Sequence, residues 1–209
     1  MVDDLLVLSK CGIESLALNT YINTRIELKK LNFHVPDEHG HTKCHKMHIG
    51  LKNNTCPELR VHGTKMEDVI DNEYLGDVIM QNGKNTKNVK KRVSRGLGVI
   101  SQIMNLLESV CFGRHYIETG LLLRVSMFLS SVLYNVEVWY DLTKAEIDEF
   151  EQLDLNLFRK ILRVPVTTPK IALYLELGLV PISILIMGRR VRYLHYLVSK
   201  KKDDMLGNF

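Results

Sequence analysis

The sequence predicts an α+β fold in which a small antiparallel sheet with one helix precedes an all-α bundle. Short apolar or alternating runs separated by turn residues fill the first 83 residues, and Asn82-Gly83, which tolerates positive φ, closes this region. From Thr86 onward, apolar residues instead recur every three or four positions, which is the helical period. This change of pattern near Lys84 predicts two domains, at 1–83 and 84–209.

The first domain is expected to contain one helix and several short strands. The apolar run at 5–8 is typical of a buried strand, because it is too short for a helix and lies between the Asp3-Asp4 pair and Ser9. Apolar residues near a helical spacing predict a helix over 13–31. Further strands are expected at 44–49, 59–62, 65–70 and 74–80.

The second domain is expected to be helical throughout. Thr143 followed three positions later by Glu146 forms a capping box, which predicts the start of a helix that ends before Pro165. Pro169 and Pro181 mark the starts of two later helices, since proline suits the first turn. The expected helices are 86–110, 115–139, 143–163, 168–178 and 181–200.

Composition limits the class of protein. Hydrophobic residues make up 45% and charged residues 25% of the 209 positions, which is typical of folded domains and excludes wholesale disorder. The most apolar window, 117–139, contains Glu118, Arg124 and Glu137, so it predicts a core helix rather than a membrane span. Four widely spread cysteines without a secretory signal predict reduced thiols in an intracellular protein.

The chain opens with two adjacent carboxylates, Asp3 and Asp4, in the turn before the 5–8 strand. Two carboxylates a few ångströms apart repel each other, so one pKa rises unless a cation joins them. Magnesium is the natural cation, because it takes carboxylate oxygens and leaves room for substrate phosphates. The alternative is a solvated acidic turn with no bound ion.

A basic stretch spans 84–95 and contains six basic residues and no acid. Within it, Lys87, Lys91 and Arg95 are spaced four residues apart and share one helix face. Together with Lys84 they crowd a helix N-terminus, where the helix dipole disfavours cations. A polyanion such as a nucleic-acid backbone would reverse both penalties, so the sequence predicts nucleic-acid binding here.

The order of these features resembles a known family. A turn of the form x-x-Asp-Asp before an apolar strand resembles the Tyr/Phe-x-Asp-Asp box of reverse transcriptases, with Met1 where the family usually has an aromatic residue. The sequence around Lys43, the Tyr74-Leu75-Gly76 tripeptide and the basic helical region then follow in the order of motif D, motif E and the thumb. The resemblance is to the non-LTR (LINE-like) retrotransposon branch and covers nearly the whole chain.

The resemblance implies a function for each region. Residues 1–83 would be the C-terminal part of the palm and 84–209 a helical thumb. Asp3 and Asp4 would supply two of three carboxylate ligands for catalytic Mg²⁺, and Lys43 would lie near the departing pyrophosphate. Tyr74, Leu75 and Gly76 would form the primer grip.

The implied substrates are an RNA template and a DNA primer. The third carboxylate and the fingers belong upstream in the family, so the chain is expected to be inactive alone but able to bind primer–template. An upstream polypeptide would complete the palm. No membrane association is expected.

Other interpretations stay open on the sequence alone. The chain could be a non-catalytic helical module that binds nucleic acid or another protein, and Lys43 could be a solvated lysine at a strand start. A second basic cluster that includes Arg189, Arg190 and Arg192 could also follow a phosphate backbone. A zinc site would use Cys44, His48, Cys56 and His62, although Cys44 and His48 on one strand would lie about 13 Å apart.

Overall fold

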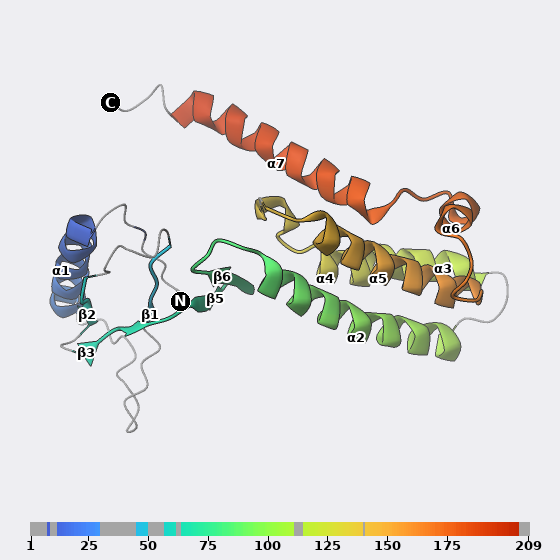
Figure 1. Cartoon of the computed structure of the whole chain (residues 1–209), viewed down its shortest axis with the longest axis horizontal. Coiled ribbons are helices and arrows are strands. Elements are labelled where there is room, and N and C mark those ends of the chain that lie inside the picture. The colour runs from blue at the N-terminus through green and yellow to red at the C-terminus, as the bar shows by residue number, and fades with distance from the viewer. Residues whose placement is uncertain are drawn as a thin grey trace. The chain divides into compact units, whose positions relative to one another are not determined.

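A computed structural model describes residues 8, 12–29, 45–49, 57–61, 64–110, 115–139 and 141–204 (Figure 1). The chain divides into two compact units, Met1–Asn85 and Thr86–Phe209. The predicted boundary at 83 and 84 lies two residues from this division. Among the described residues, helices dominate and the short strands all lie in the first unit, which agrees with the α+β class.

The described residues of the first unit form one helix, α1 (Gly12–Lys29), and three pairs of short strands. Strand β1 (His45–Lys46) pairs in parallel with β4 (Glu67–Asp68), and β2 (Arg60–Val61) pairs antiparallel with β3 (Thr64–Lys65). Strand β5 (Asp71–Tyr74) and β6 (Asp77–Met80) form an antiparallel hairpin.

The predicted single antiparallel sheet was therefore wrong for the described residues, which form three separate two-stranded ladders, one of them parallel. The strand predicted at 74–80 is divided, because Leu75 and Gly76 both adopt positive φ, 49° and 83°, and turn the chain back on itself. Leu8 is the one described residue of the strand predicted at 5–8. It is exposed and lies outside any strand, so it gives no support to a buried strand there.

The second unit begins with the long helix α2 (Thr86–Val110), as the apolar spacing predicts. The helix expected at 115–139 is divided into α3 (Tyr116–Leu123), a π-helical segment (Arg124–Leu129), α4 (Ser130–Val132) and a 3-10 turn (Val136–Val138). The regular helix ends at Val132, and Asn135, which adopts the left-handed conformation with φ of 58°, precedes the 3-10 turn.

The last three helices follow the prediction closely (Figure 1). Helix α5 (Lys144–Leu162) starts at the predicted capping box, in which Thr143 and Glu146 hydrogen-bond to each other's backbone N–H. Helix α6 (Lys170–Leu177) ends at Gly178, which takes a left-handed φ of 62°. Helix α7 (Ile182–Asp204) follows.

The core lies in the second unit, where α2, α5 and the α3–α4 segment pack together. Its fully buried side chains include Ile103, Leu107, Phe128, Phe150 and Leu157. Gly96 on α2 allows close helix packing: a Cβ there would lie 2.5 Å from Leu153 Cδ2 and 2.8 Å from Val132 Cγ2. This close approach fixes one face of α2 against the core and leaves the opposite face to solvent.

Candidate nucleic-acid interface

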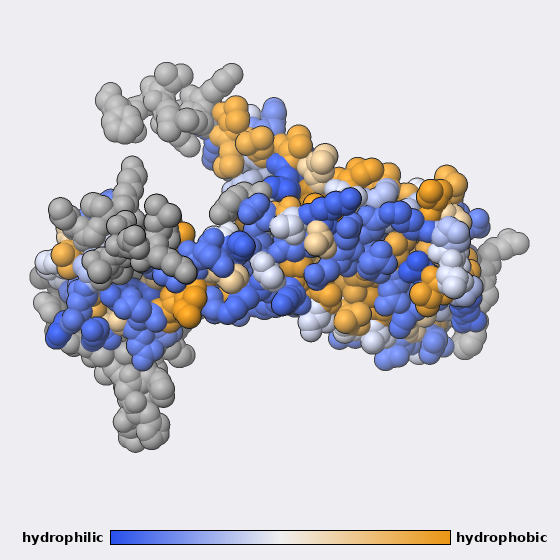
Figure 2. Space-filling view, in the orientation of Figure 1, coloured by the Kyte–Doolittle hydropathy of each residue, from blue (hydrophilic) through white to orange (hydrophobic). Residues whose placement is uncertain are grey.

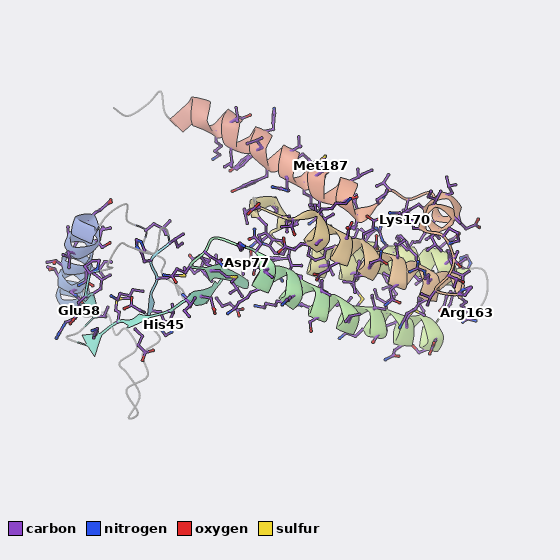
Figure 3. The ribbon with its side chains drawn as sticks, viewed as in Figure 1. His45, Glu58, Asp77, Arg163, Lys170 and Met187 are labelled. Carbon is purple, nitrogen blue, oxygen red and sulfur yellow. The ribbon has the colours of Figure 1, made fainter. Side chains whose placement is uncertain are left out.

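Residues Tyr74, Leu75 and Gly76 form the tip of the β5–β6 hairpin. Tyr74 closes the ladder opposite Asp77, so Leu75 and Gly76 are the two central turn residues. Leu75 is 59% exposed in a left-handed conformation that branched and bulky residues rarely adopt. Asp77, labelled in Figure 3, is buried at the start of β6. The predicted primer-grip residues thus form a tight turn that presents a leucine side chain.

The base of the hairpin is held by backbone hydrogen bonds. Gln81 donates its N–H to the Ile70 carbonyl at 2.8 Å, and Gly83 donates to the Met80 carbonyl at 2.9 Å. The Lys84 N–H donates to Asn82 Oδ1 at 3.0 Å, which makes 82–84 a compact turn directly before α2. The Lys84 side chain is exposed.

The basic residues of α2 lie on the face opposite to the core. At about 100° per residue, Lys87, Lys91 and Arg95 span about 80° of the helix circumference. Lys87 and Arg95 are exposed and Lys91 is half-buried, whereas Val89 and Ile100 on the other side are buried. Lys90 is exposed beside them, and the first turn of α2 contains no acidic residue. The structure therefore brings Lys87, Lys91 and Arg95 together on one accessible face.

Arg92 differs from the other basic residues of this stretch. Its side chain is buried, and its guanidinium carbon lies 4.7 Å from the centroid of the Tyr134 ring. From the sequence, Arg92 was counted only among the six basic residues of 84–95, and its packing role was not predicted. The signal was present, because Arg92 lies three residues after Val89 and four before Gly96, on the buried stripe.

The second basic cluster is partly structural. Arg189 of α7 donates from Nη1 to the Leu133 carbonyl at 2.8 Å, beside the tyrosine that Arg92 contacts. Helices α2 and α7 are thus both anchored at the turn after α4. Further along α7, the rings of Tyr193 and Tyr196 stack with centroids 6.3 Å apart, and Lys200 Nζ lies 5.8 Å from the Tyr196 centroid.

A buried ion pair lies at the start of the π-helical segment. Arg124 donates from Nε and Nη2 to the two carboxylate oxygens of Asp154, at 2.8 and 2.7 Å, and both side chains are almost completely buried. Burial raises the pKa of Asp154, and the hydrogen bonds and charge of Arg124 oppose that rise. Because both side chains are buried inside the bundle, the pair contributes to the packing of the fold and is not accessible to a ligand.

A second, more exposed pair lies close to it in the fold. Lys170 Nζ lies 3.2 Å from Glu151 Oε1 and links α6 to α5 (Figure 3). The ring of Tyr174 packs edge-on against Phe158, and burial raises the pKa of the Tyr174 hydroxyl. These contacts hold α6 against α5, so they too belong to the packing of the bundle.

The predicted magnesium and pyrophosphate residues, Asp3, Asp4 and Lys43, lie outside the described residues, as do Cys44, Cys56 and His62 of the zinc alternative. In the described part of the chain, no three His, Cys, Asp or Glu side chains are grouped to hold a metal ion. His48 is described, and its Nε2 is buried without a hydrogen-bond partner.

Within the described ranges, no single helix is long and apolar enough to cross a membrane. Helices α6 and α7 together reach that threshold of length and composition, but they are bent by 66° where they meet.

The chain has no match among family models, curated proteins or solved structures. Two separate features are candidates for contact with nucleic acid: the exposed basic face of α2 in the second unit and the exposed hairpin tip at 74–76 in the first unit.

Proposed function

We propose that this chain is the C-terminal palm and thumb portion of a non-LTR reverse transcriptase, and that it binds a primer–template duplex. The first unit would be the palm part and the second unit the thumb. In this proposal the basic face of α2 lies along the phosphate backbone, and the β5–β6 tip contacts the primer strand.

The observation that carries the proposal is the basic face of α2. Lys87, Lys91 and Arg95 are like charges at successive four-residue spacings, and each such neighbour costs about 0.2–0.5 kcal/mol. Lys87 also lies in the first turn of the helix, where the positive end of the dipole repels it. Phosphates along a nucleic-acid backbone would be attracted to this run of positive charge, and their counterions would be released on binding.

The hairpin tip supplies a second, independent reason. Leucine in a left-handed conformation costs about 1–2 kcal/mol relative to glycine, and Asn-Gly is the preferred pair for a turn of this type. Backbone strain at an exposed side chain is a common property of binding sites. Leu75 at this tip is suited to an apolar contact with a sugar or base of the primer.

Asp3, Asp4 and Lys43 lie outside the described residues, so the proposal concerns duplex binding and makes no claim about catalysis. In the family, Mg²⁺ would be held by Asp3 and Asp4 and would activate the attacking hydroxyl and stabilise the leaving pyrophosphate. The duplex-binding proposal does not depend on that ion, because its contacts come from α2 and the hairpin.

The test is a titration of the protein with a fluorescently labelled RNA–DNA hybrid at two salt concentrations. The double variant Lys87→Gln/Lys91→Gln should bind about tenfold more weakly at low salt, and its salt slope should fall by about two. The matched control, Lys144→Gln/Lys160→Gln, removes the same charge from exposed positions of α5 and should change affinity by less than about twofold. Equal weakening by both pairs would show that only net charge matters and would refute the proposal.

The alternative function is a helical module that binds another protein. It is favoured by one specific feature of the second unit, the exposed apolar side chains on the outer side of α7.

A further inference from the structure

Helix α7 has apolar residues on two opposite sides. In the first turns of the helix the inner side, with Ile182 and Ile186, is buried against the bundle. The outer side carries five large apolar side chains that are 54–68% exposed: Ile184, Met187, Val191, Leu194 and Val198. Figure 2 shows hydrophobic surface along α7 and around α6. A helix that is apolar on both sides is normally covered on both.

The five outer residues follow one another at intervals of three, four, three and four positions, which is the heptad spacing of a coiled coil. Ile184, Val191 and Val198 take the a positions, and Met187 and Leu194 take the d positions. β-Branched residues at a with leucine-like residues at d favour pairing with a single partner helix. We call these five residues the α7 seam.

The α7 seam is narrow. At about 100° per residue its five members fall within about 80° of the helix circumference. Arg190 borders this arc on one side and His195 on the other. The a/d spacing of these five residues is that of a helix-pairing surface. Tyr196 and Leu197 of the same helix are also 52% and 44% exposed, outside this arc.

The charge around the α7 seam selects the partner. From 177 to 202 the sequence contains no acidic residue, and the positions that flank the seam include Arg190 and His195, with Arg192 further round the helix. Two copies of α7 paired in parallel would bring Arg190 of one copy opposite His195 of the other, which offers no attraction. A partner helix with glutamate or aspartate beside its own apolar seam would instead form opposite-charge pairs across the edges.

We propose that the α7 seam docks an acidic amphipathic helix of another polypeptide, with apolar residues at its a and d positions and carboxylates at its e and g positions. This inference goes beyond duplex binding and is independent of it, because the α7 seam and the basic face of α2 share no residue.

The test uses the full chain and a labelled synthetic helix of about three heptads, with leucine and isoleucine at a and d and glutamate at e and g. Fluorescence anisotropy should show saturable binding. A second peptide with lysine at e and g should bind at least about tenfold more weakly at low ionic strength, and the difference should shrink as salt is added.

Met187→Glu/Leu194→Glu should weaken binding of the acidic peptide by at least about tenfold, because two seam side chains are replaced by like charges. Both positions are exposed, so the fold should be retained, as circular dichroism will show. The control variant Leu122→Glu/Val166→Glu adds the same charge at exposed apolar positions away from α7 and should bind the peptide normally. The seam variant should also keep its affinity for the RNA–DNA hybrid.

Three results would overturn the proposal. The first is equal binding of the acidic and basic peptides, or none. The second is self-association of the unmodified chain in sedimentation velocity that Met187→Glu/Leu194→Glu abolishes, which would make a second copy the occupant. The third is binding to phosphatidylserine-containing vesicles, lost in the same variant, without peptide binding.

Discussion

The two units of the chain differ in what they bury. The described residues include twenty buried apolar side chains, and all of them belong to the second unit. In the described part of the first unit, the buried residues are Lys46, Asp77 and Asn85, all polar. Burial of apolar area is the main favourable term in folding. The second unit therefore has a core of its own, and the described strands of the first unit do not.

Polar contacts and backbone hydrogen bonds hold the described strands of the first unit together. Lys46 donates to the Pro57 carbonyl at 2.8 Å and pairs with Asp68 at 3.2 Å, and Glu58 pairs with Arg60 and Lys65. Isolated two-stranded ladders are at best marginally stable in water. The helical unit should therefore set the main unfolding transition, while the hairpin should open locally.

The largest expected effect comes from the buried ion pair of the second unit. Arg124→Met leaves the Asp154 carboxylate buried without its partner and should lower the free energy of unfolding at pH 7 by about 3–5 kcal/mol. Urea denaturation followed by circular dichroism measures this. The double variant Arg124→Met/Asp154→Leu should recover most of the loss, and failure to recover would point to lost packing of Arg124 on Phe158 instead.

The stability of the Arg124→Met variant should also depend on pH. Removing Arg124 removes the hydrogen bonds and the charge that lower the pKa of Asp154, and burial then raises that pKa further above its ordinary 3.8. The folded variant thus holds its proton at higher pH than the unfolded chain. Its stability is greatest below the unfolded pKa and falls as pH rises through the raised value. The deficit relative to the unmodified protein should therefore shrink in acid, and a constant deficit would contradict the assignment.

The next largest effect is expected where α2 packs closely against the core at Gly96. Gly96→Ala should destabilise the protein by about 1–2 kcal/mol, because its Cβ would overlap the buried Leu153 and Val132. Gly98→Ala is the matched control, since nothing lies within 4 Å of its Cβ. It should instead stabilise α2 by about 0.5–1 kcal/mol. If both variants shift the transition in the same direction, the packing account is wrong.

A smaller effect comes from the start of α5. Thr143→Ala removes the side chain that accepts the Glu146 N–H and should cost about 1 kcal/mol. Thermal melting will detect the shift. Ser126→Ala, at an exposed helical position, should change stability by less than about 0.5 kcal/mol.

The smallest global effect is expected in the first unit. Leu75→Asn relieves the left-handed strain at the hairpin tip and should raise the protection of the β5–β6 amides against hydrogen exchange severalfold. The main unfolding transition should stay within about 0.5 kcal/mol of the unmodified value. A shift as large as that of Gly96→Ala would mean that the two units unfold together.

The sequence predicted best what local patterns determine. The spacing of apolar residues located α2, and the Thr143 and Glu146 pair located the start of α5. The residue pattern alone assigned 74–80 to one strand, although Gly76 already offered the turn position that divides it.

Contacts between residues far apart in the sequence could not be predicted from local patterns. Arg124 stood out only as a charge that interrupts an apolar window, and its partner is 30 positions away. No local periodicity indicates that Arg124 pairs with Asp154. Nor does any local pattern indicate that the Arg92 guanidinium packs over the Tyr134 ring. Of the candidate site, the basic residues on one face of α2 and the tripeptide at 74–76 were predicted together as nucleic-acid contacts. That role remains a proposal.

Hydrogen exchange of the full chain, with and without a saturating RNA–DNA hybrid, tests the proposed interface most directly. We expect the hybrid to slow exchange in the first half of α2 and in the β5–β6 hairpin, and to leave α5 unchanged. Slowed exchange elsewhere in the chain, with neither α2 nor the hairpin affected, would contradict the proposal.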